Sequence, residues 1–518
     1  MKNKYLVLLM IVLITSFAIG MNVHPSMAAD KSKYGGILKP NHSKQAGIIG
    51  DPLLIQAWNH EFVDFVLETI VRASNDRFGE FDPVLCESWK TDQENLNITF
   101  NLRKGMKFHD GTNADAQAVK WNYSRYLTSS KPQLSTMKSI DIIDDHTVRV
   151  NFKFWDVTTF SDFTRGTFII SPTAFEKNGA EWVKYNPVGT GAFKVVKQKR
   201  NTYIEYVKNT DYWEKGLPYL DRVRFTMIPD PMTASASIRR GEIDAMLGVD
   251  PVTGTDFKKS GGFDILTNPA IHEIIYFNSE DPDSMWSDPR LREALEYAIN
   301  KKELAEVIKR GFSFPVYEIL HSITPAAGKR LGTTPRLYNP EKAKQLIKEA
   351  GHPGGIKAKI AYNSTDVSDR DMFLAMQANC KEVGITLVAN PRTGAAMNAM
   401  VLEPMPPNEL ILGSIRGGGT FGVGQTKNFF HPSSIWFRGA KRPEGFVELI
   451  DKVMTTFDLA KQLEICIEME RMAYNDAMYV PLVGNNFIVI QNPNIKDANW
   501  FWAGGPHPSL KHAWLSEK

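Results

Sequence analysis

Two glutamates in the chain directly follow a histidine, which is how the zinc-protease helix motif begins. That motif needs a second histidine one turn later, so that two imidazoles hold the metal while the glutamate acts as general base. His60-Glu61 and His272-Glu273 both lack the second histidine. The sequence therefore predicts no zinc-hydrolase site, and we expect no metal centre.

Other catalytic patterns are missing from the sequence as well. No serine has the flanking glycines of a nucleophile elbow, and the glycine run 417–419 has no following Lys-Ser or Lys-Thr to cradle phosphate. Cys86, Cys380 and Cys466 lie among apolar neighbours, which favours buried thiols; one disulfide stays open as an alternative. We expect a binding protein without catalytic residues or cofactor, and a secreted hydrolase is the least favoured alternative.

The composition is that of an ordinary globular protein. The 518 residues carry 61 basic and 58 acidic side chains, a formal net charge of +3, and 43% are hydrophobic. That length corresponds to about three domains, and the small net charge gives no reason to expect a nucleic-acid partner. Aromatic residues reach 11%, with 11 Trp and 16 Tyr, which is more than core packing alone needs.

Residues 1–28 have the pattern of a secretory signal peptide. Lys2 and Lys4 precede an apolar run from Tyr5 to Gly20, and small residues lead to an expected cleavage site after Ala28. The run is shorter than the roughly 20 residues that cross a bilayer, although an uncleaved anchor is an alternative. Because no cysteine lies near the cleavage site, we expect no lipid attachment. We expect an exported, periplasmic monomer with no membrane anchor.

The elements that must position a binding site are mixed α and β. Period-two alternation of apolar residues predicts strands with one solvated face at 96–102, 148–154 and 223–227. Capping residues predict helices that begin at Asp288-Pro289, Asn300 and Asn339-Pro340. Strands dominate early and helices later, so we expect an α/β protein with at least two lobes.

Five motifs occur in a characteristic order along the chain. They are PVLCESW at 83–89, FNLRKGMKFHDGT at 100–112, NPVGTGAF at 186–193, DPRLREAL at 288–295 and YVPL at 479–482. With these motifs the mature chain resembles the extracellular solute-binding proteins of family 5, the dipeptide, oligopeptide and nickel class of ABC importers. Cys86 departs from the small residue usual at its position, a change that a buried site tolerates.

Most residues in these motifs are expected to be structural. The glycines at 105, 111, 189 and 191 are predicted to sit in turns that need unusual backbone angles. His109-Asp110 is predicted to form a local hydrogen-bonding corner, in preference to a ligand site.

The resemblance implies a two-lobed periplasmic-binding-protein fold of type II, similar to cluster C, with an extra subdomain in lobe one and two hinge crossings. The expected boundaries are 29–268 for lobe one with its subdomain at 56–165, 278–478 for lobe two, and 481–518 for the return to lobe one. It also implies a receptor that closes on a small solute and delivers it to the transmembrane subunits of an ABC permease.

The ligand is predicted from two arginines. Peptide binders of the family have a Trp and an ammonium-binding Asp in a lobe-two loop, whereas the corresponding stretch 412–421 has neither and offers Arg416. Because a buried ammonium without a carboxylate partner is costly, a free-amine peptide is disfavoured. Arg165 resembles the arginine that receives ligand carboxylates in the nickel-chelate binder. Arg165 and Arg416 together favour a carboxylate-bearing or anionic solute, the alternative being surface or interlobe ion pairs.

Aromatic side chains complete the predicted site, because flat rings supply apolar area at low rotamer cost. The candidates are Trp58, Phe421, Trp436 and Trp502, with core packing as the alternative for each. His431 is a candidate ligand for a metal chelate, as a histidine is in the nickel binder. A binder of peptides or nickel chelates, and a ligand sensor on the same fold, remain alternatives, and the identity of the solute stays open.

Overall fold

The computed structural model describes residues 31–517 apart from a set of internal gaps. The gaps are 75–79, 130–132, 165, 319, 321–333, 401–402, 417–422, 435 and 502–507. The predicted signal peptide, its cleavage site and the possible N-terminal anchor therefore lie outside the described residues. Within the described chain, no helix is both long and apolar enough to cross a membrane.

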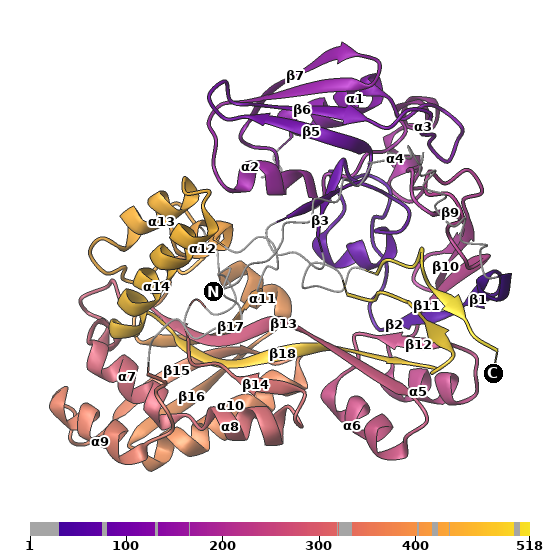
Figure 1. Ribbon diagram of the computed structural model, residues 1–518. Helices are drawn as coiled ribbons and strands as arrows, with labels where there is room; N and C mark the ends of the chain where they lie inside the picture. Colours follow the sequence, from indigo (N-terminus) through magenta and orange to yellow (C-terminus); the bar gives the residue numbers. More distant parts are fainter. Residues whose placement is uncertain are drawn as a thin grey trace, which may run out of the picture.

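One long mixed sheet runs through both halves of the molecule (Figure 1). Its strands, in spatial order, are β16 (Ile385–Arg392), β15 (Ile356–Asn363), β17 (Glu409–Arg416), β13 (Asp264–Phe277), β18 (Val480–Gln491), β12 (Ala245–Leu247), β2 (Pro40–His42), β11 (Arg222–Met227), β10 (Tyr203–Lys208) and β9 (Phe193–Lys199). Two short strands join this path, β1 (Ile37–Leu38) on β11 and β14 (Ser313–Pro315) on β18. The predicted strand at 223–227 lies in β11.

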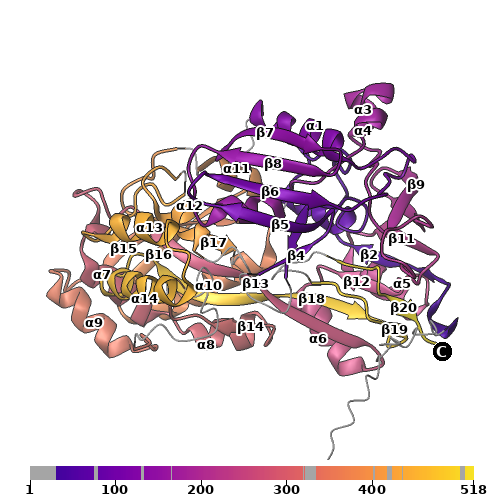
Figure 2. The same ribbon diagram turned by 45° about the horizontal axis from the view of Figure 1, so that its top comes forward.

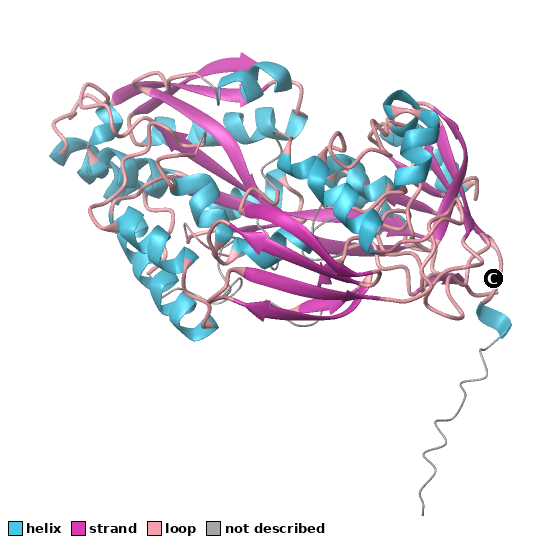
Figure 3. Cartoon of the chain, turned by 90° about the horizontal axis from the view of Figure 1, so that it is seen from above, coloured by secondary structure: helices cyan, strands magenta, loops and turns pink. Residues whose placement is uncertain are grey.

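The two longest strands, β13 and β18, connect two separate hydrophobic cores. They pair antiparallel from Asp264 opposite Gln491 to Ile275 opposite Val480. At one end, Ile275 and Val480 are buried among residues of β15–β17. At the other end, Val489 is buried among residues of β10–β12. This arrangement is the two-lobed α/β fold expected from the sequence. Figure 2 shows β13 and β18 passing from one lobe to the other, and the view from above in Figure 3 shows long strands crossing the middle of the molecule.

Lobe two, which contains β15–β17, is covered by helices on both faces of its sheet. The helices are α7 (Pro289–Ala298), α8 (Lys301–Glu303), α9 (Pro340–Glu349), α10 (Val367–Glu382), α11 (Gly394–Met400), α12 (Gly424–Phe430), α13 (Phe446–Met454) and α14 (Leu459–Asn475). The predicted helix starts are confirmed, because Asp288, Asn300 and Asn339 each accept a backbone N–H of their helix. After α8 the chain continues as a π-helical turn, η5 (Leu304–Ile308).

Lobe one, which contains β9–β12, carries a smaller sheet with its own core (Figure 1). That sheet has the order β5 (Cys86–Asp92), β6 (Asn97–Leu102), β8 (Thr147–Phe152) and β7 (Met137–Asp144), and α1 (Ala116–Leu127) packs on it. The predicted strands at 96–102 and 148–154 correspond to β6 and β8. The exact lobe and subdomain boundaries given above stay predictions.

The remaining elements are short. The helices are α2 (Thr158–Ser161), α3 (Pro172–Asn178), α4 (Ala180–Val183), α5 (Pro231–Arg239) and α6 (Pro251–Ser260), with 3-10 turns η1 (Lys31–Lys33), η2 (Ala57–Phe62), η3 (Asp162–Thr164) and η4 (Met285–Ser287). Two strand pairs complete the list, β3 (Val71–Ala73) with β4 (Phe81–Pro83) and β19 (Ile495–Lys496) with β20 (Trp514–Leu515). All three cysteines are buried free thiols, so the disulfide left open above does not form.

The His109-Asp110 motif is the hydrogen-bonding corner that the sequence predicts. His109 Nε2 lies 2.9 Å from the carbonyl oxygen of Gly191, and Asp110 accepts from the Thr112 amide and from the Ser171 hydroxyl. Burial lowers the pKa of His109 to about 4, so its ring is neutral at physiological pH. The corner ties the subdomain sheet to the loop that precedes β9.

The prediction for the motif glycines is half right. Gly105 and Gly111 have φ of +74° and +85°, as expected for turns that favour glycine. Gly189 and Gly191 are outside this left-handed region, so the prediction is wrong for them. They are needed for close packing instead, because a Cβ at Gly189 would lie 2.3 Å from the Val66 carbonyl oxygen and one at Gly191 would lie 2.7 Å from that of Phe65.

We therefore expect Gly189→Ala to lower the free energy of unfolding by about 1–3 kcal/mol, since the added methyl group can only be accommodated by a backbone shift. Gly354→Ala is the matched control, because a Cβ there would meet nothing within 4 Å. Urea denaturation of both variants is the measurement. Equal stability of the two variants would contradict the close-packing account.

Candidate functional site

A cavity of about 1190 Å³ lies at the carboxyl ends of the parallel strands of lobe two. Asn363 at the end of β15, Gly394 just after β16 and Ser414 near the end of β17 line it. Its other wall includes Asp250 at the start of α6 in lobe one and Asn486 in the connecting strand β18. Ligands of α/β sheets bind beyond the carboxyl ends of their strands. The cavity has that position and spans both lobes.

Aromatic rings form an apolar wall of this cavity. The ring of Tyr276 on β13 lies close against Gly413. A Cβ added at Gly413 would be 2.7 Å from the Cε1 atom of Tyr276. The ring of Phe437 meets Tyr276 edge-on with 4.8 Å between centroids, and Phe429 and Trp436 continue the wall. Burial raises the pKa of Tyr276 to about 12, so its hydroxyl remains a hydrogen-bond donor at physiological pH.

A buried ion pair forms the opposite, polar wall. Lys309, which directly follows η5, places its Nζ 2.7 Å from Glu273 Oε1, and Asn485 donates to the same oxygen at 2.6 Å. Glu273 is only 7% exposed and Lys309 only 4%. The Glu273 Oε2 atom has no hydrogen-bond partner among the described residues. The register of β13 against β18 shifts between Glu273 and Ile274, beside this wall of the cavity.

A second carboxyl group, that of Asp369 in the first turn of α10, lies beside this pair and lines the same cavity. Burial, reinforced by the neighbouring carboxylates of Glu273 and Asp366, raises the pKa of Asp369 to about 7, against the opposing effect of Lys309. Asp366 caps α10 by accepting the Ser368 amide at 2.8 Å. The polar wall therefore holds more negative than positive charge.

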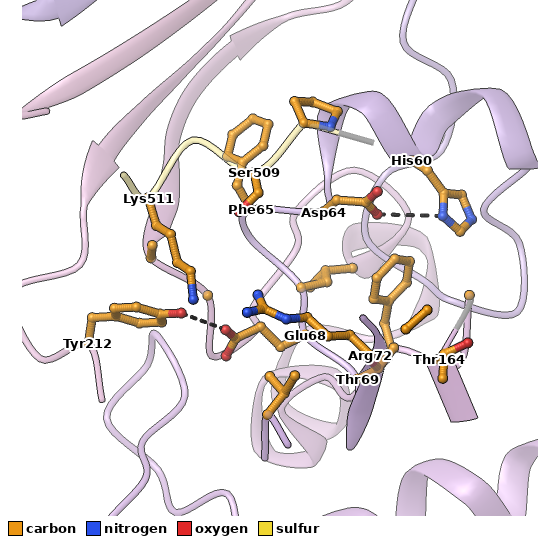
Figure 4. Close-up of a pocket in the computed structure, with 18 residues that line it drawn as sticks. His60, Asp64, Phe65, Glu68, Thr69, Arg72, Thr164, Tyr212, Ser509 and Lys511 are labelled. Carbon is orange, nitrogen blue, oxygen red and sulfur yellow. Dashed lines mark hydrogen bonds and ion pairs between the residues drawn. The ribbon is translucent and has the colours of Figure 1, made fainter. Parts of the chain in front are cut away.

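A second cavity, of about 110 Å³, lies within lobe one (Figure 4). Its central carboxyl group, Glu68, accepts hydrogen bonds from Tyr212 and Thr190, each at 2.8 Å, and the Trp213 indole donates to it as well. Lys511 from the C-terminal segment also lines this cavity and pairs with Glu214. These partners come from distant parts of lobe one, so the hydrogen bonds to Glu68 hold that lobe together. The cavity of about 1190 Å³, which is lined by both lobes, is therefore the candidate site.

The subdomain touches lobe two at α12, which lines the cavity, and at the end of the neighbouring α13 (Figure 1). The Val157 amide, just before α2, donates to the Met454 carbonyl oxygen at 2.8 Å. The Val157 side chain packs against the core under α13 and α14. A Cβ at Gly424 would lie 2.8 Å from Thr158 Cγ2. The two lobes thus meet across the cavity as well as through β13 and β18.

The structure places only part of the predicted site. Arg165, Phe421 and Trp502 lie outside the described residues. The backbone of Trp58 lies in η2 and that of Arg416 ends β17, two residues beyond Ser414 of the cavity wall, but their side chains are not described. Their roles stay predictions.

Two predicted side chains are described. Trp436 lines the cavity and is 40% exposed, so its side chain is accessible to a ligand there. Its contact with the ligand stays a prediction. His431 follows α12, and its Nδ1 lies 2.6 Å from the Ser433 hydroxyl; the residue is outside the lining of the cavity. Among the residues that the structure describes, no group of three or more His, Cys, Asp or Glu is arranged to hold a metal ion.

Sequence reasoning missed the polar wall. Glu273 comes from a strand, Lys309 from the position after a π-helical turn and Asp369 from a helix, and only the fold brings them together. One signal was available, because Glu273 is a charged residue inside a run of apolar strand residues. Its pairing with Lys309 could not be read from the sequence.

Comparison with known proteins identifies the family. Residues 80–411 match the model of the bacterial extracellular solute-binding proteins, family 5. The chain is 26% identical over 440 residues to the glutathione-binding protein GsiB of Shigella flexneri, covering 81% of this chain and 83% of that protein.

Solved structures agree on the fold. The periplasmic binding protein DppA from Helicobacter pylori in complex with the peptide STSA superposes with a TM-score of 0.77 at 22% identity, covering 94% of this chain and 99% of that one. NikA from Brucella suis in complex with Fe(III)-EDTA gives 0.81 at 21% identity, covering 92% and 99%. The chain belongs to the family 5 solute-binding proteins of ABC transporters.

The raised pKa of Asp369 predicts a pH-dependent stability. Because the folded protein holds this proton more tightly than the unfolded chain, whose carboxyl titrates near 4, stability falls as pH rises from about 4 to about 7. Asp369→Asn removes the penalty, so we expect a gain of about 1–2 kcal/mol at pH 8, allowing for solvent screening, and little change at pH 4.

Thermal melting of ligand-free protein at both pH values checks this expectation. Asp371→Asn is the matched control, because it removes the same charge from a half-exposed position on the same helix, outside the cavity lining. A gain at pH 8 in the control alone, or in neither variant, would contradict the electrostatic account of the polar wall.

Proposed function

We propose that the protein is the receptor of an ABC importer, capturing a small carboxylate-bearing solute in the cavity at the end of β17 and handing it unchanged to a membrane permease. The observation that carries this proposal is the position of the cavity, which is bounded by both lobes and by the strands that connect them. Family membership supports the receptor role, since the family is one of solute-binding proteins.

Capture is proposed to occur by closure of the lobes. Two connecting strands allow one lobe to rotate against the other, which is the motion by which periplasmic binding proteins enclose ligand. The contact of Val157 with Met454 provides a second junction that forms when the lobes meet. Exclusion of water from the closed cavity strengthens each polar contact and slows release of the solute.

The carboxylate specificity rests on two arginines and on the relatives. Arg416 ends the strand that lines the cavity, and Arg165 directly follows Thr164 of η3. Guanidinium groups bind carboxylates through paired hydrogen bonds. The ligands of the similar proteins, which are glutathione, the peptide STSA and Fe(III)-EDTA, all contain carboxyl groups. We propose the same functional group for the solute of this protein.

Export to the periplasm is part of the proposal. The basic head, the short apolar run and the small residues before position 29 support a cleaved signal peptide. The partners are then the transmembrane subunits of a permease, with the receptor acting as a monomer.

A thermal-shift screen of organic acids tests this function. We expect carboxylate-bearing binders to raise the melting temperature of the wild-type protein by several degrees, and Arg165→Ala and Arg416→Ala each to lose most of that shift. Arg149→Ala, at an exposed position on β8 of the subdomain, is the control. Unchanged shifts in both Arg165→Ala and Arg416→Ala would refute carboxylate recognition by these residues.

A further inference from the structure

We propose that the polar wall of the cavity is a cation-accepting subsite, in which Asp369 and Glu273 bind a protonated amine of the solute. The inference rests on the proposed function and narrows it: the solute would carry an ammonium group as well as a carboxylate. This subsite differs from the expectation drawn from residues 412–421. The absence of an acidic residue from that stretch disfavoured a solute with a free amine.

The ammonium group of Lys309 is already engaged within the polar wall. Its ammonium already bonds Glu273 Oε1 at 2.7 Å and also donates to the Ser368 hydroxyl. Among the described residues of this wall, one positive charge is therefore shared by three carboxylates, those of Glu273, Asp366 and Asp369. The other lysine that lines the cavity, Lys427 on α12, lies 6.0 Å from the centre of the Phe154 ring. An additional cation would balance the wall.

One carboxylate oxygen of Glu273 lacks a hydrogen-bond donor among the described residues. The residue is 7% exposed, and its Oε2 has no hydrogen-bond partner among the described residues. Leaving a buried carboxylate oxygen without a donor is costly, by about 1–3 kcal/mol or more. Because Glu273 lines the cavity, a ligand donor is the natural partner.

The carboxyl group of Asp369 lies among both negative and positive neighbours. Four groups act on it: Glu273 from β13, Asp366 from the start of α10, Lys309 from the turn after η5, and the Asn363 backbone from the end of β15. Their sum, together with burial, raises its pKa to about 7, which means that these surroundings disfavour the charged carboxylate. A ligand ammonium would lower that pKa and stabilise the charged form.

The chemistry of the occupant follows from these features. An ammonium group has three donors, enough for Asp369 and for Glu273 Oε2 at once. The aromatic wall of Tyr276, Phe437 and Trp436 suits the apolar body of such a molecule. Within the described residues no three potential ligands are arranged for a metal ion, which favours an organic cation as the occupant. An amino acid derivative or short peptide fits this description.

Matched probes with and without an amine test the subsite. The probes are glutathione, trialanine and 6-aminohexanoate, each compared with its N-acetylated form, and calorimetry measures their affinities for the intact mature protein. We expect acetylation to weaken binding at least tenfold. Asp369→Asn and Glu273→Gln should weaken the amine forms to a similar extent and leave the acetylated forms unchanged, while the control Asp371→Asn should behave as wild type.

The pH dependence gives a second readout. Affinity for the amine probes should rise several-fold between pH 6 and pH 8, because Asp369 loses its proton over this range, and this rise should be absent in Asp369→Asn. If Glu273→Gln does not fold because Lys309 loses its partner, Asp369→Asn carries the test alone.

The outcomes separate this inference from the proposed function. Acetylated forms that bind as tightly as the amines, or variants that keep full affinity for the amines, overturn the subsite while leaving a carboxylate receptor in place. Failure of every probe in both forms to bind, when each carries a carboxylate, overturns the subsite together with the proposed carboxylate specificity.

Discussion

The rest of the structure depends on the antiparallel pairing of β13 and β18. These strands hold residues 264–277 against residues 480–491, and they belong to both hydrophobic cores. Because the same two strands join the lobes and line the cavity, a change in lobe angle moves the walls of the site directly. Glu273 and Asn485 lie on these strands, so two groups of the polar wall move with the hinge itself.

The polar wall lowers the stability of the folded protein. A buried ion pair with an unsatisfied oxygen, beside a carboxyl group whose pKa is raised by burial, contributes little to stability and would be replaced at small loss by apolar residues. Such features are typical of binding sites, where ligand supplies the missing partner. The network around Glu68 in lobe one differs, because its donors come from the protein itself.

Sequence reasoning recovered the local structure well. Alternation of apolar residues located β6, β8 and β11, and capping residues located the starts of α7, α8 and α9, because both signals depend on neighbouring residues. It failed at Gly189 and Gly191, where the reason for glycine is a backbone that lies far away in the sequence. The site was harder still: Glu273 and Lys309 are 36 positions apart, and Asp369 lies on another helix. The resemblance to a family predicted the two lobes. The polar wall could be identified only from the three-dimensional structure.

The most direct test of the account is native mass spectrometry of the protein, purified without denaturation, to identify any solute that it retains. We predict a bound small molecule with both a carboxyl group and an amine, released on unfolding and absent from Asp369→Asn. A retained solute with neither group, held equally well by Asp369→Asn, would contradict the account.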